Sequence, residues 1–147
     1  MARLGTAAEE ELGAIRVLLE SAGLPTDDLD SARPAFAVVR ENGQVVAAGA
    51  LQRFGSSALL RSVVVSEHRR GSGLGQMIVR ELERLARAAQ ISELILLTET
   101  ATEFFAHQGY RDVERTTVPQ AIQMSEEFRF LCPSSATCMA KSLPRSA

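Results

Sequence analysis

The residues best suited to chemistry lie in a basic, glycine-rich segment, residues 69–75, which follows an apolar run. Gly71, Gly73 and Gly75 stand beside two arginines, and an amphipathic helix pattern begins at Leu74. The first turn of a helix has backbone N–H groups without intrahelical partners and carries partial positive charge. Glycine lets an anion approach those amides closely. The segment therefore predicts an anion site, with phosphate as the natural ligand.

The spacing of the glycines excludes two common phosphate-binding classes. A phosphate-loop NTPase needs a Gly-Lys-Ser/Thr ending, and no such lysine follows these glycines. A dinucleotide-binding fold needs a third glycine three residues after the second glycine of a Gly-x-Gly pair. That position is Gln76 for the pair Gly71 and Gly73, and Ile78 for the pair Gly73 and Gly75. The ribose-binding acid is also missing from the end of the next apolar run, which offers only Glu99 beyond Thr98.

Other candidate residues lie on the flanking apolar runs. Thr98 and Glu99 end the run after the helix, where α/β folds place their sites, so Glu99 is the preferred base or water-holding residue, with simple surface charge as the alternative. Arg61 and Val63 are two residues apart in the predicted strand, so their side chains are expected on the same face. Its guanidinium could hold an acidic substrate by two hydrogen bonds, or it could form an ion pair at the strand edge.

Composition limits the class of protein. A chain of 147 residues, 46% hydrophobic, suits one domain over residues 1–147. A net charge of -2 and a pI near 5.7 argue against broad binding to nucleic acid or an anionic membrane. The acidic N-terminal segment lacks signal-peptide features, so a cytoplasmic location is expected. No His or second Cys pair stands near Cys132 and Cys138 at the spacing of zinc ligands, so no metal is expected. Both cysteines are expected to be free, buried thiols.

The elements that must position these residues follow from periodicity. Residues 8–22 predict a helix, and residues 35–54 predict a hairpin around Asn42-Gly43. A strand over 58–66, the helix from Leu74 and a strand over 91–100 form a βαβ unit, so residues 63–65 and 94–97 should lie parallel. The remaining predicted elements are a helix over 101–110 closed by Gly109, a strand over 111–118, a helix over 119–128 and a strand over 137–143.

The glycine segment resembles the acetyl-coenzyme A loop of the GNAT (Gcn5-related) N-acetyltransferases, whose pattern is Arg/Gln-x-x-Gly-x-Gly/Ala. The resemblance implies a mixed, mostly antiparallel sheet with one splayed parallel strand pair, flanked by helices. It also implies acetyl-coenzyme A as co-substrate and the amine of a small molecule as acceptor. The implied cofactor-binding residues are Val63, Val64 and Val65 for pantetheine, and Arg70, Gly71, Ser72, Gly73, Leu74 and Gly75 for the pyrophosphate.

The resemblance also suggests catalytic roles. An N–H near Val64 or Val65 would face the developing oxyanion, and Thr98 and Glu99 would stand near the acceptor. Many family members place a proton-donating tyrosine where this chain has Phe105, which is therefore expected to line the substrate site. Tyr110 falls at a structural position and is expected to pack. His68 and His107 read as surface residues.

Four phrases resemble the ArsN-type arsenic-resistance N-acetyltransferases: "LLRSVVV", "LLTETATEFFAHQGY", "TVPQAI" and "EEFRFLCPSSATCMAKSL". This narrower resemblance implies an acidic amino-acid analogue as acceptor, of the phosphinothricin or arsinothricin type. Arg61, with a donor from Arg53 or Arg115, would hold its anionic ends. A competing hypothesis is a thiol-based arsenic-binding or sensing protein that uses Cys132 and Cys138. The sequence leaves open whether the chain forms a homodimer.

Overall fold

A computed structural model describes residues 2–131 and 134–144 of the chain. The strands are β1 (Arg3–Thr6), β2 (Ala35–Glu41), β3 (Gln44–Phe54), β4 (Ser57–Val65), β5 (Glu93–Thr98), β6 (Arg111–Asp112) and β7 (Thr137–Ser142). The α-helices are α1 (Leu12–Ser21), α2 (Leu29–Ala32), α3 (Leu74–Ala88), α4 (Thr102–His107) and α5 (Gln120–Gln123). Short 3-10 turns cover Glu9–Glu11, Glu67–Arg69 and Arg115–Thr117, and a π-helical segment covers Glu127–Leu131.

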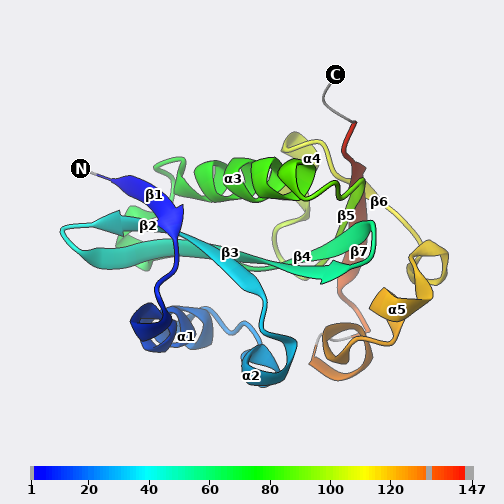
Figure 1. Cartoon of the computed structure of the whole chain (residues 1–147), viewed down its shortest axis with the longest axis horizontal. Coiled ribbons are helices and arrows are strands. Elements are labelled where there is room, and N and C mark those ends of the chain that lie inside the picture. Colours follow the sequence, from blue (N-terminus) through cyan, green and yellow to red (C-terminus); the bar gives the residue numbers. More distant parts are fainter. Residues whose placement is uncertain (1, 132–133, 145–147) are drawn as a thin grey trace.

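The described strands form one sheet in the order β1-β2-β3-β4-β5-β7-β6. Helices α3 and α4 lie over one face, and α1, α2 and α5 lie over the other (Figure 1). Neighbouring strands pair antiparallel except for β4 and β5, which are parallel. This confirms the predicted mixed, mostly antiparallel sheet flanked by helices. No helix in the described part of the chain is both long and apolar enough to cross a membrane.

Local sequence signals explain most of the elements. The predicted hairpin turns at Asn42 and Gly43, whose φ values of 53° and 77° suit a two-residue turn. The predicted stripe on α3 packs toward the sheet, with Leu74, Ile78 and Leu82 buried. The short elements β1 and α2 were not predicted, because four residues carry no readable period.

The predictions for the C-terminal part were only partly right. The strand expected over residues 111–118 is limited to β6, and its remainder includes a 3-10 turn. The helix expected over residues 119–128 is divided between α5 and the start of the π-helical segment. The predicted last strand is confirmed as β7, and Gly109 closes the end of α4 with a φ of 96°.

The parallel strands β4 and β5 pair only at their first residues. Ser57, Ala58 and Leu59 lie opposite Glu93, Leu94 and Ile95. Beyond Leu59 the described β4 residues have no partner on the β5 side, while β5 remains paired with β7 up to Thr98. The predicted parallel orientation of the two strands is therefore confirmed, and so is the predicted splay, because residues 63–65 have no pairing with β5.

A β-bulge changes which way β4 side chains point. Ala50 of β3 pairs with Arg61, but Ala48 pairs with Val64, so two β4 residues lie opposite Gly49. Ser62 takes a left-handed φ of 59° at this bulge. The expected shared parity of Arg61 and Val63 is wrong, because the extra residue places Arg61 on the same face as Val64. That face is covered by α1.

Gly49 allows α3 to lie directly on the sheet. A Cβ atom at Gly49 would stand 2.5 Å from Ile78 Cγ2 and 2.9 Å from Leu82 Cδ1. Both contacts are with fully buried side chains in a close-packed core. A side chain at this position would therefore push α3 away from the bulged part of β4.

We expect Gly49→Ala to lower the free energy of unfolding by about 1–3 kcal/mol, the usual effect of overpacking a core. Gly13→Ala is the matched control, because a Cβ atom at Gly13 on α1 meets nothing within 4 Å and alanine favours a helix. Urea unfolding followed by circular dichroism measures both. Equal stability of Gly49→Ala and the parent would contradict the packing described here.

Candidate active site

A cavity of about 430 Å³ opens where β4 and β5 diverge. Its walls are the Leu60–Val65 part of β4, the end of β5, the loop after α1, and Phe105 of α4, with Arg70, Glu127 and Ala136 at its margins. The size falls in the range of small-ligand sites. The cavity therefore extends from Arg70, in the glycine-rich segment, to the residues expected at the acceptor end.

The start of α3 is built to receive an anion. Gly73 is the N-cap residue, and no side chain caps the N–H groups that follow it. Gly71 and Gly73 have φ values of 79° and 85°, and an added Cβ atom at either would meet nothing within 4 Å. Glycine is needed at both positions for the backbone conformation, and the space above them stays open. Ser72 is exposed, and its hydroxyl donates to the Arg69 carbonyl.

Glycine is needed at position 75 for a different reason. A Cβ atom at Gly75 would stand 3.3 Å from Phe104 Cζ, so Gly75 permits the close contact of α3 with α4. Gly75 does not have a positive φ, and this packing on Phe104 is a reason for glycine that the sequence did not indicate. The two arginines also differ. Arg69 forms an ion pair of 2.7 Å with Glu41, whereas Arg70 is exposed and lines the cavity.

The three valines of β4 all line the cavity. Val64 is buried against the α1 side of the sheet, while Val63 and Val65 are partly buried against the α3 side. Of the three, Val64 alone is fully buried. At Val64 and Val65 the described part of β4 is paired with β3 but has no strand partner on its β5 side, so that backbone edge faces the cavity.

The end of β5 brings Thr98 and Glu99 to the same cavity. Glu99 is exposed to solvent at the cavity margin. The Thr98 hydroxyl accepts a hydrogen bond of 3.1 Å from the Ala101 N–H, which shapes the turn into α4. His68 and His107 are exposed and do not line the cavity, in line with the surface role expected for them.

Phe105 and Tyr110 occupy different environments. Phe105 lines the cavity and packs edge-to-face on Tyr110, with ring centroids 5.6 Å apart. Tyr110 does not line the cavity, and its O–H donates to Glu83 Oε2 at 2.9 Å. Burial, with the nearby Glu83 charge, raises the pKa of Tyr110 far above its ordinary value. The expected packing role of Tyr110 is confirmed, because the phenol is held away from the cavity.

Arg61 lies at the cavity but is buried, with its residue 3% exposed. Its Nη1 donates to Asp28 Oδ2 at 2.6 Å, and its Nη2 donates to Asp28 Oδ1 at 2.5 Å. Nη1 also donates to Gln52 Oε1 at 3.0 Å, and Nε stands 3.8 Å from Glu127 Oε1. The ion pair weighed as an alternative is present, but it is buried, not on the surface.

Sequence reasoning missed Asp28, Gln52 and Glu127. A signal was available, because an arginine inside an apolar strand must find a buried acid or leave an uncompensated charge. The identity of that acid was not readable, since Asp28 is 33 residues away in the sequence.

The two other arginines proposed as substrate donors have different positions. Arg53 Nε donates to the Gly55 carbonyl at the turn before β4, away from the cavity lining. Arg115 Nη2 donates to the Ala136 carbonyl at 2.8 Å and so supports the segment before β7. Neither lines the cavity, so the structure does not bring them to Arg61 as expected.

The described cysteine is unsuited to ligand binding. Cys138 is buried among apolar side chains, and burial raises the pKa of its thiol to about 11. Cys132 lies outside the described residues. Within those residues, no group of three or more His, Cys, Asp or Glu side chains could hold a metal ion.

Comparison with known proteins identifies the family. The family described as Acetyltransferase (GNAT) domain matches residues 32–112, which is more than half of the chain. An amino-acid acetyltransferase of Mycobacterium tuberculosis is 37% identical over 93 residues, covering 63% of this chain and 50% of the relative. An uncharacterised N-acetyltransferase of Chlorobaculum tepidum is 31% identical over 88 residues, covering 59% and 56%. The chain belongs to the GNAT acetyltransferase family, and it spans about half the length of these curated relatives.

Solved structures agree with this assignment. A Mycobacterium tuberculosis protein in complex with CoA and NLQ has a TM-score of 0.83 and 27% identity, covering 97% of this chain and 99% of its own. The N-acetylglutamate synthase of Neisseria gonorrhoeae, complexed with coenzyme A and N-acetyl-glutamate, has a TM-score of 0.84 at 19% identity, covering 99% and 36%. The second similarity concerns the fold alone.

Proposed function

We propose that the chain is an acetyl-CoA-dependent N-acetyltransferase that moves an acetyl group to the amine of a small molecule. The observation that carries the proposal is the cavity between the splayed strands β4 and β5, which Arg70 lines, together with the uncapped, glycine-rich start of α3 that follows Arg70 in the chain. Membership of the GNAT family and the CoA complexes of structural neighbours support it.

The residues present fit coenzyme A. The first N–H groups of α3 and the Arg70 guanidinium offer positive charge to the pyrophosphate. The free edge of β4 at Val63, Val64 and Val65 offers backbone groups to the amides of the pantetheine arm, as an edge strand does for an added peptide. We propose that the N–H of Val64 faces the thioester carbonyl, and the bulge at Ser62 supports this by turning the β4 backbone at the cavity.

The acetyl group moves when a neutral amine nitrogen attacks the thioester carbonyl. A carbon–nitrogen bond forms, the carbon–sulfur bond breaks, and the electron pair leaves with the sulfur. We propose that Glu99, directly or through a water held with Thr98, receives the proton that the nitrogen loses. The thiolate needs no protein acid, because a thiol with a pKa of about 8.5 is a good leaving group and takes its proton from solvent.

The acceptor is proposed to be an amino acid or an analogue of one. The similarity to an amino-acid acetyltransferase supports this class. The narrower proposal, from the ArsN-type resemblance, is an acidic analogue of the phosphinothricin or arsinothricin type and a role in arsenic or toxin resistance. We also propose a cytoplasmic location, which agrees with the free thiol of Cys138.

A panel of acceptors tests the substrate class. Acetyl-CoA is mixed with the protein and with matched acidic, neutral and cationic amino acids, and the released thiol is measured. We expect the acidic members to give the highest kcat/KM. Preference for neutral or cationic members would remove the acidic-acceptor proposal and leave the acetyltransferase class intact.

Two aromatic substitutions test the absence of a protein acid. Tyr110→Phe should keep most activity, because the hydroxyl bonds Glu83 outside the cavity. Phe105→Ala should lower turnover by loosening the cavity wall. Steady-state rates below the melting temperature measure both. A loss of about a hundredfold in a folded Tyr110→Phe variant, the size typical of removing a general acid, would contradict this mechanism.

The competing thiol hypothesis predicts a different result. A binder that uses Cys132 and Cys138 would lose its ligand when both thiols are alkylated, whereas an acetyltransferase should still bind coenzyme A. The burial of Cys138 and its raised pKa favour the acetyltransferase.

A further inference from the structure

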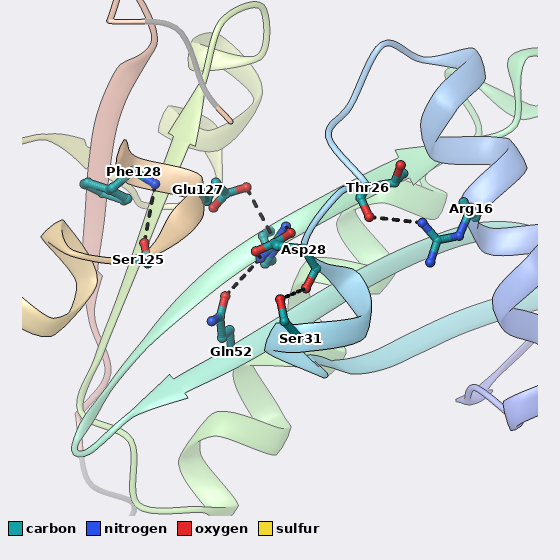
Figure 2. A network of polar contacts seen from close by, with 9 residues as sticks. Arg16, Thr26, Asp28, Ser31, Gln52, Ser125, Glu127 and Phe128 are labelled. Carbon is teal, nitrogen blue, oxygen red and sulfur yellow. Dashed lines mark hydrogen bonds and ion pairs between the residues drawn. The ribbon is translucent and has the colours of Figure 1, made fainter. Parts of the chain in front are cut away.

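Arg61 is the centre of a buried polar network on the wall of the cavity. Its side chain is 0% exposed, and that of Asp28 is 2% exposed. The guanidinium directs both terminal nitrogens at the Asp28 carboxylate and shares one of them with Gln52. Figure 2 shows Asp28, Gln52 and Glu127 converging from three different segments of the chain.

Stability alone does not explain such a network. The desolvation of buried charges usually offsets most of their attraction, so apolar residues of similar size would often serve as well. Buried polar groups with several fixed partners can instead specify one geometry. The Arg61 network joins residues from different segments of the chain, so it can fix the positions of those segments relative to β4.

Asp28 belongs to the loop between α1 and α2. Leu24 and Pro25 of the same loop line the cavity. Two hydrogen bonds to backbone carbonyls hold this loop in place. The Thr26 carbonyl accepts from Arg16 Nη1 at 3.0 Å, and the Asp28 carbonyl accepts from Ser31 Oγ at 3.1 Å. A shift of Asp28 would therefore move the wall as a unit.

Glu127 begins the π-helical segment and also lines the cavity. It is 5% exposed, and its Oε1 atom stands 3.8 Å from Arg61 Nε. Arg61 thus contacts one carboxylate from the loop after α1 and one from the π-helical segment. It also lies next to the Ser62 bulge, which presents the β4 backbone to the cavity.

The bonding pattern argues against a direct grip on the substrate. The two terminal nitrogens, which an anionic acceptor would use for paired hydrogen bonds, both donate to Asp28. An acceptor could engage them in the same way only by displacing a buried carboxylate.

We propose that Arg61 is a positioning residue, which holds the Asp28 loop and the π-helical segment at the spacing that orients the acceptor amine toward the β4 backbone. This inference rests on the proposed acetyltransferase function. It predicts that substitutions of Asp28 or Arg61 lower kcat/KM for the acceptor and do not change the affinity for coenzyme A.

The test compares Asp28→Asn with Asp27→Asn, its exposed neighbour with the same change of charge. Kinetics use acetyl-CoA and the best acceptor of the panel, and calorimetry measures coenzyme A affinity. Asp28→Asn should lower acceptor kcat/KM on the order of tenfold to a hundredfold, the effect of misplacing reacting groups slightly. Coenzyme A affinity should stay within about twofold, and Asp27→Asn should match the parent.

Arg61→Lys should show the same pattern, and the double variant should be no worse than the more impaired single variant, because both remove one contact. If Arg61 instead bound the acceptor directly, Asp28→Asn would not lower acceptor kcat/KM, since an Arg61 released from Asp28 would bind an acidic acceptor equally well or better. Unchanged acceptor kinetics in Asp28→Asn, with or without a lower melting temperature, would also overturn the proposal.

Gln52→Met covers the case in which Asp28→Asn does not fold. Gln52 does not line the cavity, and its Oε1 accepts a hydrogen bond from the same Arg61 Nη1 that donates to Asp28, so its loss should lower acceptor kcat/KM several-fold in the same direction. Parent-like kinetics in a folded Gln52→Met variant would then count against the proposal. A parent that binds acetyl-CoA but acetylates no amine would instead remove the proposed function itself.

Discussion

Replacing Gly73 with glutamate is expected to abolish coenzyme A binding. Gly73 caps α3 with a φ of 85°, and an added Cβ atom there would meet nothing within 4 Å, so the position is open to a ligand such as the pyrophosphate. A glutamate side chain would strain this backbone and place a negative charge among the N–H groups that bind phosphate. Acetyl-CoA should raise the melting temperature of the parent and leave that of the variant unchanged.

Gly55→Glu is the control for backbone strain and charge. Gly55 also has a positive φ, of 67°, and an added Cβ atom there meets nothing within 4 Å. It lies in the turn before β4, at the opposite end of that strand from the glycine segment. This variant should bind coenzyme A like the parent, and calorimetry of both variants measures the difference. Parent-like affinity in Gly73→Glu would show that the loop does not hold the cofactor.

Glu99→Gln is expected to lower kcat by about 10²–10⁴, the range typical of losing a general base. The substitution keeps the shape of the side chain at the cavity margin and removes its capacity to accept a proton. Coenzyme A affinity should not change, because Glu99 lies at the end of β5 and not on the glycine segment.

Glu103→Gln is the matched control for this prediction. Glu103 is an exposed carboxylate on α4 that does not line the cavity, so its loss should leave the rate within about twofold of the parent's, as usual for surface changes. Stopped reactions analysed for released thiol give kcat for both variants. Equal rates for Glu99→Gln and Glu103→Gln would assign Glu99 to the surface and leave proton transfer to water.

The fold was readable from the sequence wherever its determinants are local. The Asn42-Gly43 turn and the stripe on α3 are set by residues close in the chain, and both were predicted. The splay of β4 from β5 was expected from family resemblance and not from periodicity. The π-helical segment was missed, because its sequence has an ordinary helical pattern.

The candidate site was predictable to a lesser degree. The glycine segment was found because three closely spaced glycines before a helix have a physical meaning on their own. The orientation of Arg61 was predicted wrongly, because a bulge at a serine leaves no sequence signal and reverses the alternation of β4. Its partner Asp28 was missed because the two are brought together only by the packing of α1 and α2 on the sheet.

The proposed reaction transfers an acetyl group from acetyl-CoA to an amine. The most direct measurement combines the protein with acetyl-CoA and the amino-acid panel, and quantifies released coenzyme A thiol and N-acetylated product in the same samples by mass spectrometry. Equal amounts of thiol and N-acetylated product, both absent without the protein or with Gly73→Glu, are the predicted result. Thiol release that does not depend on any amine and yields no N-acetylated product would contradict the account.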